Sequence, residues 1–228
     1  MTAGVDLSHI DTWLFDLDNT LYPPEVGYLK LVEAKILAYF ERLTGLPADE
    51  AWALQKRYLD QHGTATAGLI EHHGVDPHHF MADVHDVPLD TLHPDPALRR
   101  ALVRLPGRRL VFTNGSAWHA ERVLKRLELD DLFEAVFHAE AADMIAKPDP
   151  RAFAALIAAH AITPKTTAFF EDRAVNLAPA FALGMTTILV GPEAVQDGAA
   201  SSTDAFVQHR TATLAPFLDA ARIKEPVP

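Results

Sequence analysis

Hydrophobic residues in this chain gather in short unbroken runs that end in polar clusters. Four runs are clear, at residues 13–15, 110–112, 168–170 and 185–190, and a weaker one lies at 135–137. Continuous apolar runs of this length are typical of strands that are buried on both faces of a parallel sheet. The pattern therefore predicts a parallel β-sheet at the centre of the fold.

Segments with the period of an amphipathic helix lie between these runs. Alanine, valine and leucine recur over residues 120–127 at the spacing of one buried helix face. Asp149 followed by Pro150 is typical of a helix start, because aspartate caps free N–H groups and proline fits the first turn. Strands that alternate with helices predict right-handed βαβ units. The predicted fold class is α/β, with a doubly wound, Rossmann-like parallel sheet.

Residues 24–92 break this alternation. They contain no convincing strand and resemble several helices separated by glycine and proline. We predict that they form a helical cap domain inserted after the first strand, called the cap below. The α/β core then consists of residues 1–23 and 93–228. Within the core, residues 193–203 are expected to form a loop and residues 213–223 a closing helix.

Composition and charge restrict the class of partner. The formal net charge of -11 argues against binding a nucleic-acid polymer, which needs a basic face. No apolar stretch approaches the ~18 residues of a membrane span, and the N-terminus lacks the pattern of a signal peptide. The absence of cysteine fits a reducing compartment, so we expect a cytoplasmic protein. The sequence makes no prediction about its oligomeric state.

Three of the predicted strands end in polar side chains suited to catalysis. Asp16 and Asp18 follow the first strand, Thr113 follows the second run, and Glu171 and Asp172 follow the run at 168–170. Ligands of open α/β sheets bind beyond the carboxyl ends of the strands. If these strands are neighbours, four carboxylates gather there and cannot all stay ionised unaided. All-oxygen ligands favour Mg²⁺ as the compensating cation.

This arrangement suggests phosphoryl transfer. A carboxylate such as Asp16 can attack phosphorus, and Asp18 can act as the general acid/base for the leaving group. Thr113 offers a hydroxyl, Asn114 a backbone N–H, and Lys147 a positive charge to the phosphoryl oxygens. With Asp18 protonated, Mg²⁺ and Lys147 balance the three remaining carboxylates, and the site can accept a small anion.

The motifs occur in a fixed order along the chain: DLDNT at 16–20, TN at 113–114, lysine before Pro148, and ED at 171–172. In this respect the sequence resembles the haloacid dehalogenase superfamily of phosphohydrolases over about residues 12–190. The resemblance implies an aspartyl-phosphate intermediate and a small phosphorylated metabolite as substrate. It assigns phosphate binding to Leu17, Thr113, Asn114 and Lys147, and Mg²⁺ binding to Asp16, the Asp18 carbonyl and Asp172.

Two further residues are expected to support the metal ligands. Glu171 is predicted to act from behind the ligands rather than as one of them, and Asn176 either orients ligands or caps a helix. A narrower resemblance, carried by FDLDNTLYP, FTNGS, KPDP and FFEDRAVNL, is to the pyrimidine 5′-nucleotidase branch. It implies a pyrimidine nucleoside 5′-monophosphate as one substrate. Many members of that branch read Asp-Asp-Ser where this chain has Glu-Asp-Arg173, so the role of Arg173 stays open.

Alternatives remain at this point. A sugar phosphate or another small metabolite could be the substrate, and dehalogenation at carbon is known in the superfamily. A phospho-acceptor signalling module would use similar residues, but such modules are about half this length and have no cap. The cap histidines, including His62, His72, His73 and His85, are interpreted as solvated side chains rather than as a transition-metal site. From the family pattern, Tyr58, His62 and Thr64 are expected to line the cap side of the substrate pocket, and Trp118 and His119 to touch substrate.

Overall fold

A six-stranded parallel sheet forms the centre of the protein. A computed structural model describes residues 4–195 and 204–224. The strands follow the order β3-β2-β1-β4-β5-β6, and every neighbouring pair is parallel. Their bounds are β1 (Thr12–Phe15), β2 (Arg108–Phe112), β3 (Ala135–Phe137), β4 (Thr167–Glu171), β5 (Thr186–Val190) and β6 (His209–Thr211). The predicted α/β class and the five predicted strands are confirmed. The edge strand β6 was not predicted, because its short half-exposed sequence contains no apolar run.

Helices cover both faces of this sheet. One face packs against α5 (Pro96–Val103), α6 (Ala117–Arg126) and α9 (Leu214–Ala220). The other packs against α7 (Pro150–His160) and α8 (Ala174–Ala182). Alternate residues of β1 point to opposite faces, so Trp13 and Phe15 join the first cluster and Leu14 joins the second. The fold is therefore doubly wound, as the alternating pattern predicted.

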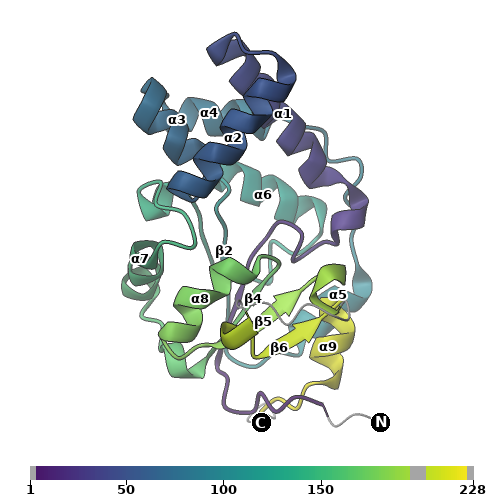
Figure 1. Cartoon of the computed structure of the whole chain (residues 1–228). Coiled ribbons are helices and arrows are strands. Elements are labelled where there is room, and N and C mark those ends of the chain that lie inside the picture. The colour runs from purple at the N-terminus through teal and green to yellow at the C-terminus, as the bar shows by residue number, and fades with distance from the viewer. Residues whose placement is uncertain (1–3, 196–203, 225–228) are drawn as a thin grey trace.

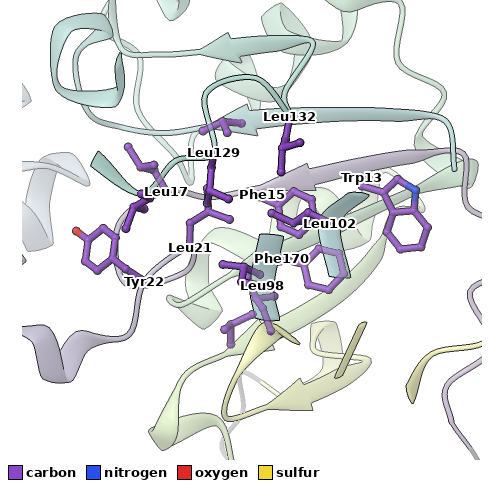
Figure 2. Packing of buried hydrophobic residues seen from close by; sticks show 14 of the residues in the cluster. Trp13, Phe15, Leu17, Leu21, Tyr22, Leu98, Leu102, Leu129, Leu132 and Phe170 are labelled. Atoms are coloured by element: carbon purple, nitrogen blue, oxygen red, sulfur yellow. The ribbon is translucent and has the colours of Figure 1, made fainter. Parts of the chain in front are cut away.

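Aromatic rings fill the first face beneath the central strands (Figure 2). Phe15 of β1 and Phe170 of β4 stack with ring centroids 4.7 Å apart, and Phe170 also stacks on Trp13 at 6.4 Å. The Trp13 indole N–H donates to the Pro106 carbonyl at 2.7 Å, so its polar atom is satisfied although the side chain is buried. This packing fixes the spacing of β1 and β4, whose ends carry the predicted catalytic acids.

The cap is helical throughout. It begins with a short 3-10 helix (Pro24–Val26) and continues as α1 (Tyr28–Thr44), α2 (Ala48–His62), α3 (Ala65–His73) and α4 (Pro77–Val84). Figure 1 shows these four α-helices gathered at one end of the molecule, beyond the sheet. They bury a hydrophobic cluster that includes Phe40, Leu54, Leu69 and Phe80, and Ala139 of the core also belongs to it. Tyr28 and Val32 of α1 pack in the first core cluster instead, so the division at residues 24 and 92 stays a proposal.

The segment that returns from the cap to the core is attached to α6. Two arginines of that helix, Arg122 and Arg126, donate hydrogen bonds to backbone carbonyls of the returning chain. The four acceptors are the carbonyls of His85, Val87, Leu89 and Leu92. The last cap helix is therefore held against a helix of the core.

The remaining predictions of local structure have mixed outcomes. Asp149 caps α7 through a bond from the Arg151 N–H at 2.8 Å, as predicted. The predicted closing helix is α9, shorter than expected at both ends. Of the loop predicted at 193–203, the first part belongs to a short 3-10 helix (Pro192–Val195), and residues 196–203 lie outside the described residues. Among the described helices, the length and apolar character needed to cross a membrane are not found.

Candidate active site

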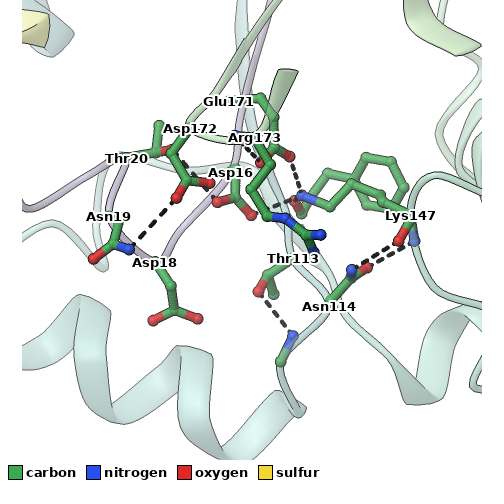
Figure 3. Close-up of polar contacts among 12 residues, drawn as sticks. Asp16, Asp18, Asn19, Thr20, Thr113, Asn114, Lys147, Glu171, Asp172 and Arg173 are labelled. Atoms are coloured by element: carbon green, nitrogen blue, oxygen red, sulfur yellow. Dashed lines mark hydrogen bonds and ion pairs between the residues drawn. The ribbon is translucent and has the colours of Figure 1, made fainter. Parts of the chain in front are cut away.

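The polar strand ends meet because β1 lies between β2 and β4 in the sheet. Asp16 follows β1, Thr113 follows β2, and Glu171 and Asp172 lie at the end of β4. The prediction that these three strands are neighbours is thus confirmed. Figure 3 shows Asp16 and Glu171 in contact with Lys147, which reaches in from the loop before α7, and Asp172 beside them.

The ammonium group of Lys147 is buried and donates to three acceptors. These are Asp16 Oδ1, Glu171 Oε2 and the Phe112 carbonyl, each at 2.7 Å. A lysine ammonium has three hydrogens, so all of them have a partner here. Lys147 therefore neutralises the carboxylates directly, and contact with a phosphoryl oxygen would require it to exchange one of these partners. Figure 3 shows Lys147 with its partners Asp16 and Glu171.

We call Asp16, Glu171 and Asp172 the acid cluster. Burial, followed by repulsion from Glu171, raises the pKa of Asp16 to about 7. Burial, followed by repulsion from Glu171 and Asp16, raises the pKa of Asp172 to about 9. Burial also acts to raise the pKa of Glu171, but its contacts with Lys147 outweigh burial and lower it. One lysine thus stabilises only part of the negative charge, and the cluster needs either protons or a further cation.

The acid cluster fits a divalent cation. One carboxylate oxygen from each of its three members lies within 4.8 Å of the others, as a shared ion requires. Asn176 lines the same cleft, and its buried Oδ1 has no hydrogen-bond partner. An acceptor in that state is suited to a metal-bound water or to the metal itself. Asn176 lies inside α8, where Arg173 is the N-cap, so the alternative that Asn176 caps a helix is wrong.

The carboxylate of Asp18 is held by a buried histidine. His119 Nε2 lies 2.9 and 3.0 Å from its two oxygens, and the Tyr22 hydroxyl donates to Oδ1 at 2.6 Å. Because a carboxylate only accepts, Nε2 is the donor, and in a neutral ring Nδ1 accepts from the Tyr28 hydroxyl at 3.3 Å. Burial acts to raise the pKa of Asp18, but His119 and Tyr22 outweigh it and lower the pKa. These contacts favour the ionised carboxylate, in contrast to the protonated Asp18 that the predicted charge balance requires.

A second buried histidine supports the first. The His85 ring stacks on His119 with centroids 4.2 Å apart, and its Nδ1 lies 3.2 Å from Ser116 Oγ. Burial, and then repulsion from His119, lowers the pKa of His85 to about 3, so this ring is neutral. The interpretation of His85 as a solvated cap side chain is therefore wrong. Of the same group, His72 and His73 are exposed, as expected.

The loop after β2 is built around hydrogen bonds to its side chains. Thr113 Oγ1 accepts from the Gly115 N–H at 2.9 Å. The Asn114 side chain donates to the Lys147 carbonyl at 3.1 Å and accepts from the Lys147 N–H at 2.8 Å. Asn114 therefore positions the loop that carries Lys147. The sequence predicted only a backbone contact from Asn114 to phosphate, not this role of its side chain. A Cβ at Gly115 would lie 2.7 Å from His119 Cδ2, so glycine permits the histidine to approach.

Three residues of the neighbouring turns complete the rim. The Leu17 side chain packs in the core cluster, so only its backbone is available for the predicted phosphate contact (Figure 2). Asn19 has a left-handed backbone, with φ of 60°, and its amide donates to Asp172 Oδ2 at 3.4 Å. Arg173 is exposed at the start of α8 and lines the cleft, while its N–H donates to Glu171 at 3.1 Å.

A cleft of about 400 Å³ lies between this site and the cap. Its floor includes Asp16, Asp18, Thr113, Lys147 and Asp172, so the predicted residues share one cavity. Its cap wall is largely apolar, and the cap residues concerned are Leu29, Val32, Glu33, Ile36, Gln55, Leu59, Thr64, Ala65, Thr66, Phe80, Met81, Val84 and His85. Thr64 is where the family pattern placed it, whereas Tyr58 and His62 are not among the lining residues. Trp118 is exposed, beneath the Arg122 guanidinium.

Comparison with known sequences agrees with this geometry. Residues 10–184 match the model of the haloacid dehalogenase-like hydrolase family. Among characterised proteins, phosphate metabolism protein 8 of Saccharomyces cerevisiae (strain ATCC 204508 / S288c) is 29% identical over 195 residues. That alignment covers 78% of this chain and 60% of the yeast protein, so the chain spans less than two thirds of this relative.

Comparison with solved structures identifies the same fold. A HAD phosphatase from Thermococcus onnurineus superposes with a TM-score of 0.61 and 20% identity, covering 90% of this chain and 94% of that one. An L-2-haloacid dehalogenase from Xanthobacter autotrophicus, with chloropropionic acid covalently bound, gives 0.58 and 17%, covering 92% and 97%. At these identities the likeness concerns the fold, and the reaction must be argued from the residues of the site.

Proposed function

Because the chain belongs to the haloacid dehalogenase-like hydrolase family, we propose that it is a Mg²⁺-dependent phosphomonoester hydrolase acting through an aspartyl-phosphate. In this proposal Asp16 is the nucleophile, Asp18 the general acid/base, and Asp16, the Asp18 carbonyl and Asp172 the metal ligands. Glu171 and Asn176 support the metal from behind these ligands.

One observation carries the proposal: Asp16 and Asp18 lie in the same cleft but have different partners. Asp16 contacts Lys147 within the acid cluster, whereas Asp18 contacts His119 and Tyr22. Two carboxyl groups with separate environments can take separate roles. Dehalogenation at carbon needs neither a second acid nor an acidic metal cluster, so these contacts favour the phosphatase.

In the first step, an Asp16 oxygen attacks phosphorus and the bond from phosphorus to the leaving oxygen breaks. The leaving oxygen takes a proton from the pair formed by Asp18 and His119. That pair begins the step with one extra proton, shared between the carboxylate and Nε2, while Nδ1–H donates to Tyr28. It ends the step as an Asp18 carboxylate facing a neutral imidazole.

In the second step, the Asp18 carboxylate acts as the base, and its lowered pKa keeps it in the ionised form that a base requires. Water attacks phosphorus, its proton passes to the Asp18–His119 pair, and Asp16 is released as a free carboxylate. The proton balance is thus restored for the next turnover. A bound divalent cation supplies charge neutralisation for the phosphoryl oxygens and keeps Asp16 ionised at neutral pH.

The cleft supports a small metabolite as the substrate. Its volume of about 400 Å³ lies in the range of small-molecule sites. The wall opposite the acids is mostly apolar, and its polar side chains are Glu33, Gln55, Thr64, Thr66 and His85. Such a wall suits a planar base better than a free sugar, so a nucleoside 5′-monophosphate is the proposed substrate class, with sugar phosphates as the alternative. A cytoplasmic location stays a prediction.

A phosphate-release screen tests the proposal. UMP, CMP, other nucleotides and sugar phosphates are offered with Mg²⁺, and again with EDTA. We expect Mg²⁺-dependent release from at least one nucleotide, loss of release in Asp16→Asn, and normal release in Asp90→Asn, which changes an exposed aspartate. No release from any compound, or release that EDTA does not affect, would overturn it. A phospho-aspartate that persists without turnover would instead indicate a signalling module.

A further inference from the structure

A second group of metal-ligating side chains lies in the cap, on α2 and α3. His62 near the end of α2 and His72 near the end of α3 face one another, with their Nε2 atoms 3.1 Å apart. Glu71 lies beside them, and its carboxylate is 3.1 Å from His62 Nδ1. These three residues form the second group in the described chain whose ligand atoms could share an ion, after the acid cluster. None of the three lines the catalytic cleft.

We propose that His62 and His72 form a binding site for a divalent transition metal, with Zn²⁺ as the model ion. Imidazole nitrogen is a preferred ligand of zinc, copper and nickel, whereas Mg²⁺ prefers oxygen. The proposed site is therefore chemically distinct from the acid cluster. Because it concerns the cap alone, it does not depend on the proposed phosphatase activity.

The geometry fits a tetrahedral ion. Two imidazoles bound to one zinc at ordinary bond lengths have their nitrogens about 3.3 Å apart. The observed separation of 3.1 Å differs by only a few tenths of an ångström, so the rings need little movement to admit the ion. In the metal-free pair one Nε2 must donate to the other. On binding, that proton moves to Nδ1 of the same ring, and both Nε2 lone pairs face the metal.

Glu71 selects the required form of His62. A carboxylate accepts only, so Nδ1 of His62 carries the proton and Nε2 keeps its lone pair for the ion. A carboxylate behind a metal-bound histidine is the usual arrangement for fixing its tautomer and raising its basicity. Water completes the coordination on the exposed side, where the Glu71 side chain is 65% accessible.

The two rings are held in place by Tyr58, a buried residue of α2. His72 stacks on its ring with centroids 4.9 Å apart, and His62 meets it edge-on at 5.8 Å. The Tyr58 hydroxyl also lies 2.9 Å from His73 Nε2. Gly68 allows α3 to approach this closely, because a Cβ there would lie 2.4 Å from Tyr58 Cγ. The histidine pair is thus built into the packing of α2 on α3.

A metal at this position would link the two helices that present Gln55, Leu59 and Thr64–Thr66 to the catalytic cleft. The ion would join His62, which precedes the turn at Gly63, to His72, which follows it; the backbone φ of Gly63 is 79°. Because the ion binds only the folded arrangement, it should raise the thermal stability of the protein by an amount that grows with the logarithm of its concentration.

Calorimetric titration of Zn²⁺ into the metal-stripped full-length Asp16→Asn/Asp172→Asn protein tests the site, since that background disables the acid cluster. We expect one ion per chain. His62→Ala or His72→Ala should abolish this binding, and Glu71→Gln should weaken it by about 10–100-fold. The matched control is His78→Ala/His79→Ala, which removes two exposed histidines of α4 and should change nothing.

Electron paramagnetic resonance with Cu²⁺ gives a readout that does not depend on the folding of a variant. The unsubstituted histidine pair should show two coordinated imidazole nitrogens. Absence of Zn²⁺ binding, binding that survives both histidine substitutions, or a copper spectrum without imidazole nitrogen would each overturn the proposal.

Discussion

His119 holds both carboxylate oxygens of Asp18, at 2.9 and 3.0 Å, from a position that is only 1% exposed. The two residues are 101 positions apart in the chain and belong to the loop after β1 and to helix α6. A carboxylate fixed by a buried ring and a tyrosine cannot rotate freely. The proposed acid/base therefore has its orientation set by the fold before any substrate arrives.

Replacing His119 should reduce turnover without removing the nucleophile. We expect His119→Ala to lower kcat by up to about 10²–10⁴-fold, the range that general acid/base catalysis contributes, with a smaller change in KM. The loss in kcat/KM, which reports the phosphorylation step, should be much smaller with p-nitrophenyl phosphate, because its leaving group needs no proton. Steady-state kinetics with a nucleotide and with this compound provide the measurement. Equal losses in kcat/KM on both substrates would contradict a role through Asp18.

Removing the charge of Lys147 should destabilise the fold as well as abolish activity. Lys147→Met leaves Asp16 and Glu171 buried without their cation, and breaking a buried pair in this way costs about 3–5 kcal/mol of unfolding free energy. Urea unfolding measures the change, and the exposed Lys30→Met is the matched control. Part of the lost stability should return at lower pH, where the two acids take up protons. A variant as stable as the parent would refute the pairing.

The metal-free protein should lose stability as pH rises. The pKa values of Asp16 and Asp172 are raised to about 7 and about 9, so the folded state keeps protons that the unfolded chain releases near pH 4. Each such group lowers the unfolding free energy by about 1.4 kcal/mol per pH unit across that interval, until its folded pKa is passed. Saturating Mg²⁺ should remove this loss, because it replaces the protons.

Thermal unfolding between pH 5 and 9, with and without Mg²⁺, measures that difference, and groups outside the cluster contribute equally to both series. Calorimetry at pH 7 in buffers of different ionisation enthalpy should also detect proton release when Mg²⁺ binds. Asp172→Asn should lose most of this release. If Mg²⁺ binds without releasing protons, the raised pKa values are not those of the metal site.

Gly115→Ala should displace the His119 ring. Its Cβ would lie 2.7 Å from His119 Cδ2, so the ring must move away from Asp18. We expect kcat to fall while circular dichroism stays unchanged. Combining it with His119→Ala should add little further loss, since the clash with the ring disappears and only the 3.2 Å contact with Thr113 Oγ1 is left. Fully additive losses would show that Gly115 acts on something other than His119.

The sequence predicted the acids of the site well, and there is a physical reason for this. Asp16, Glu171 and Asp172 each follow an apolar run, and parallel strands bring such ends to one edge of the sheet. The pairing of β1 with both β2 and β4 was the one assumption, and the sheet order confirms it. The domain boundaries and the catalytic roles stay predictions.

The histidine partner of Asp18 was not predictable in the same way. The sequence predicts only that His119 follows the phosphate loop and touches substrate, because its contact with Asp18 depends on how α6 packs rather than on any local pattern. Its position after the Ser116 cap was visible, and so was the spacing of four residues between Asp18 and Tyr22. Neither signal distinguishes a catalytic support from an ordinary helix start and turn.

The stack of His85 on His119 means that the cap does more than enclose the substrate. His85 ends the last cap helix, while His119 belongs to the core, and their rings meet at 4.2 Å. Deleting residues 24–92 would therefore remove the His85 ring that packs against His119, and with it the support of the Asp18–His119 pair. A core protein in which a short linker replaces the cap should have no detectable activity, rather than slow activity on a wider range of substrates. During evolution, a replacement cap would have had to supply an equivalent aromatic surface at this junction.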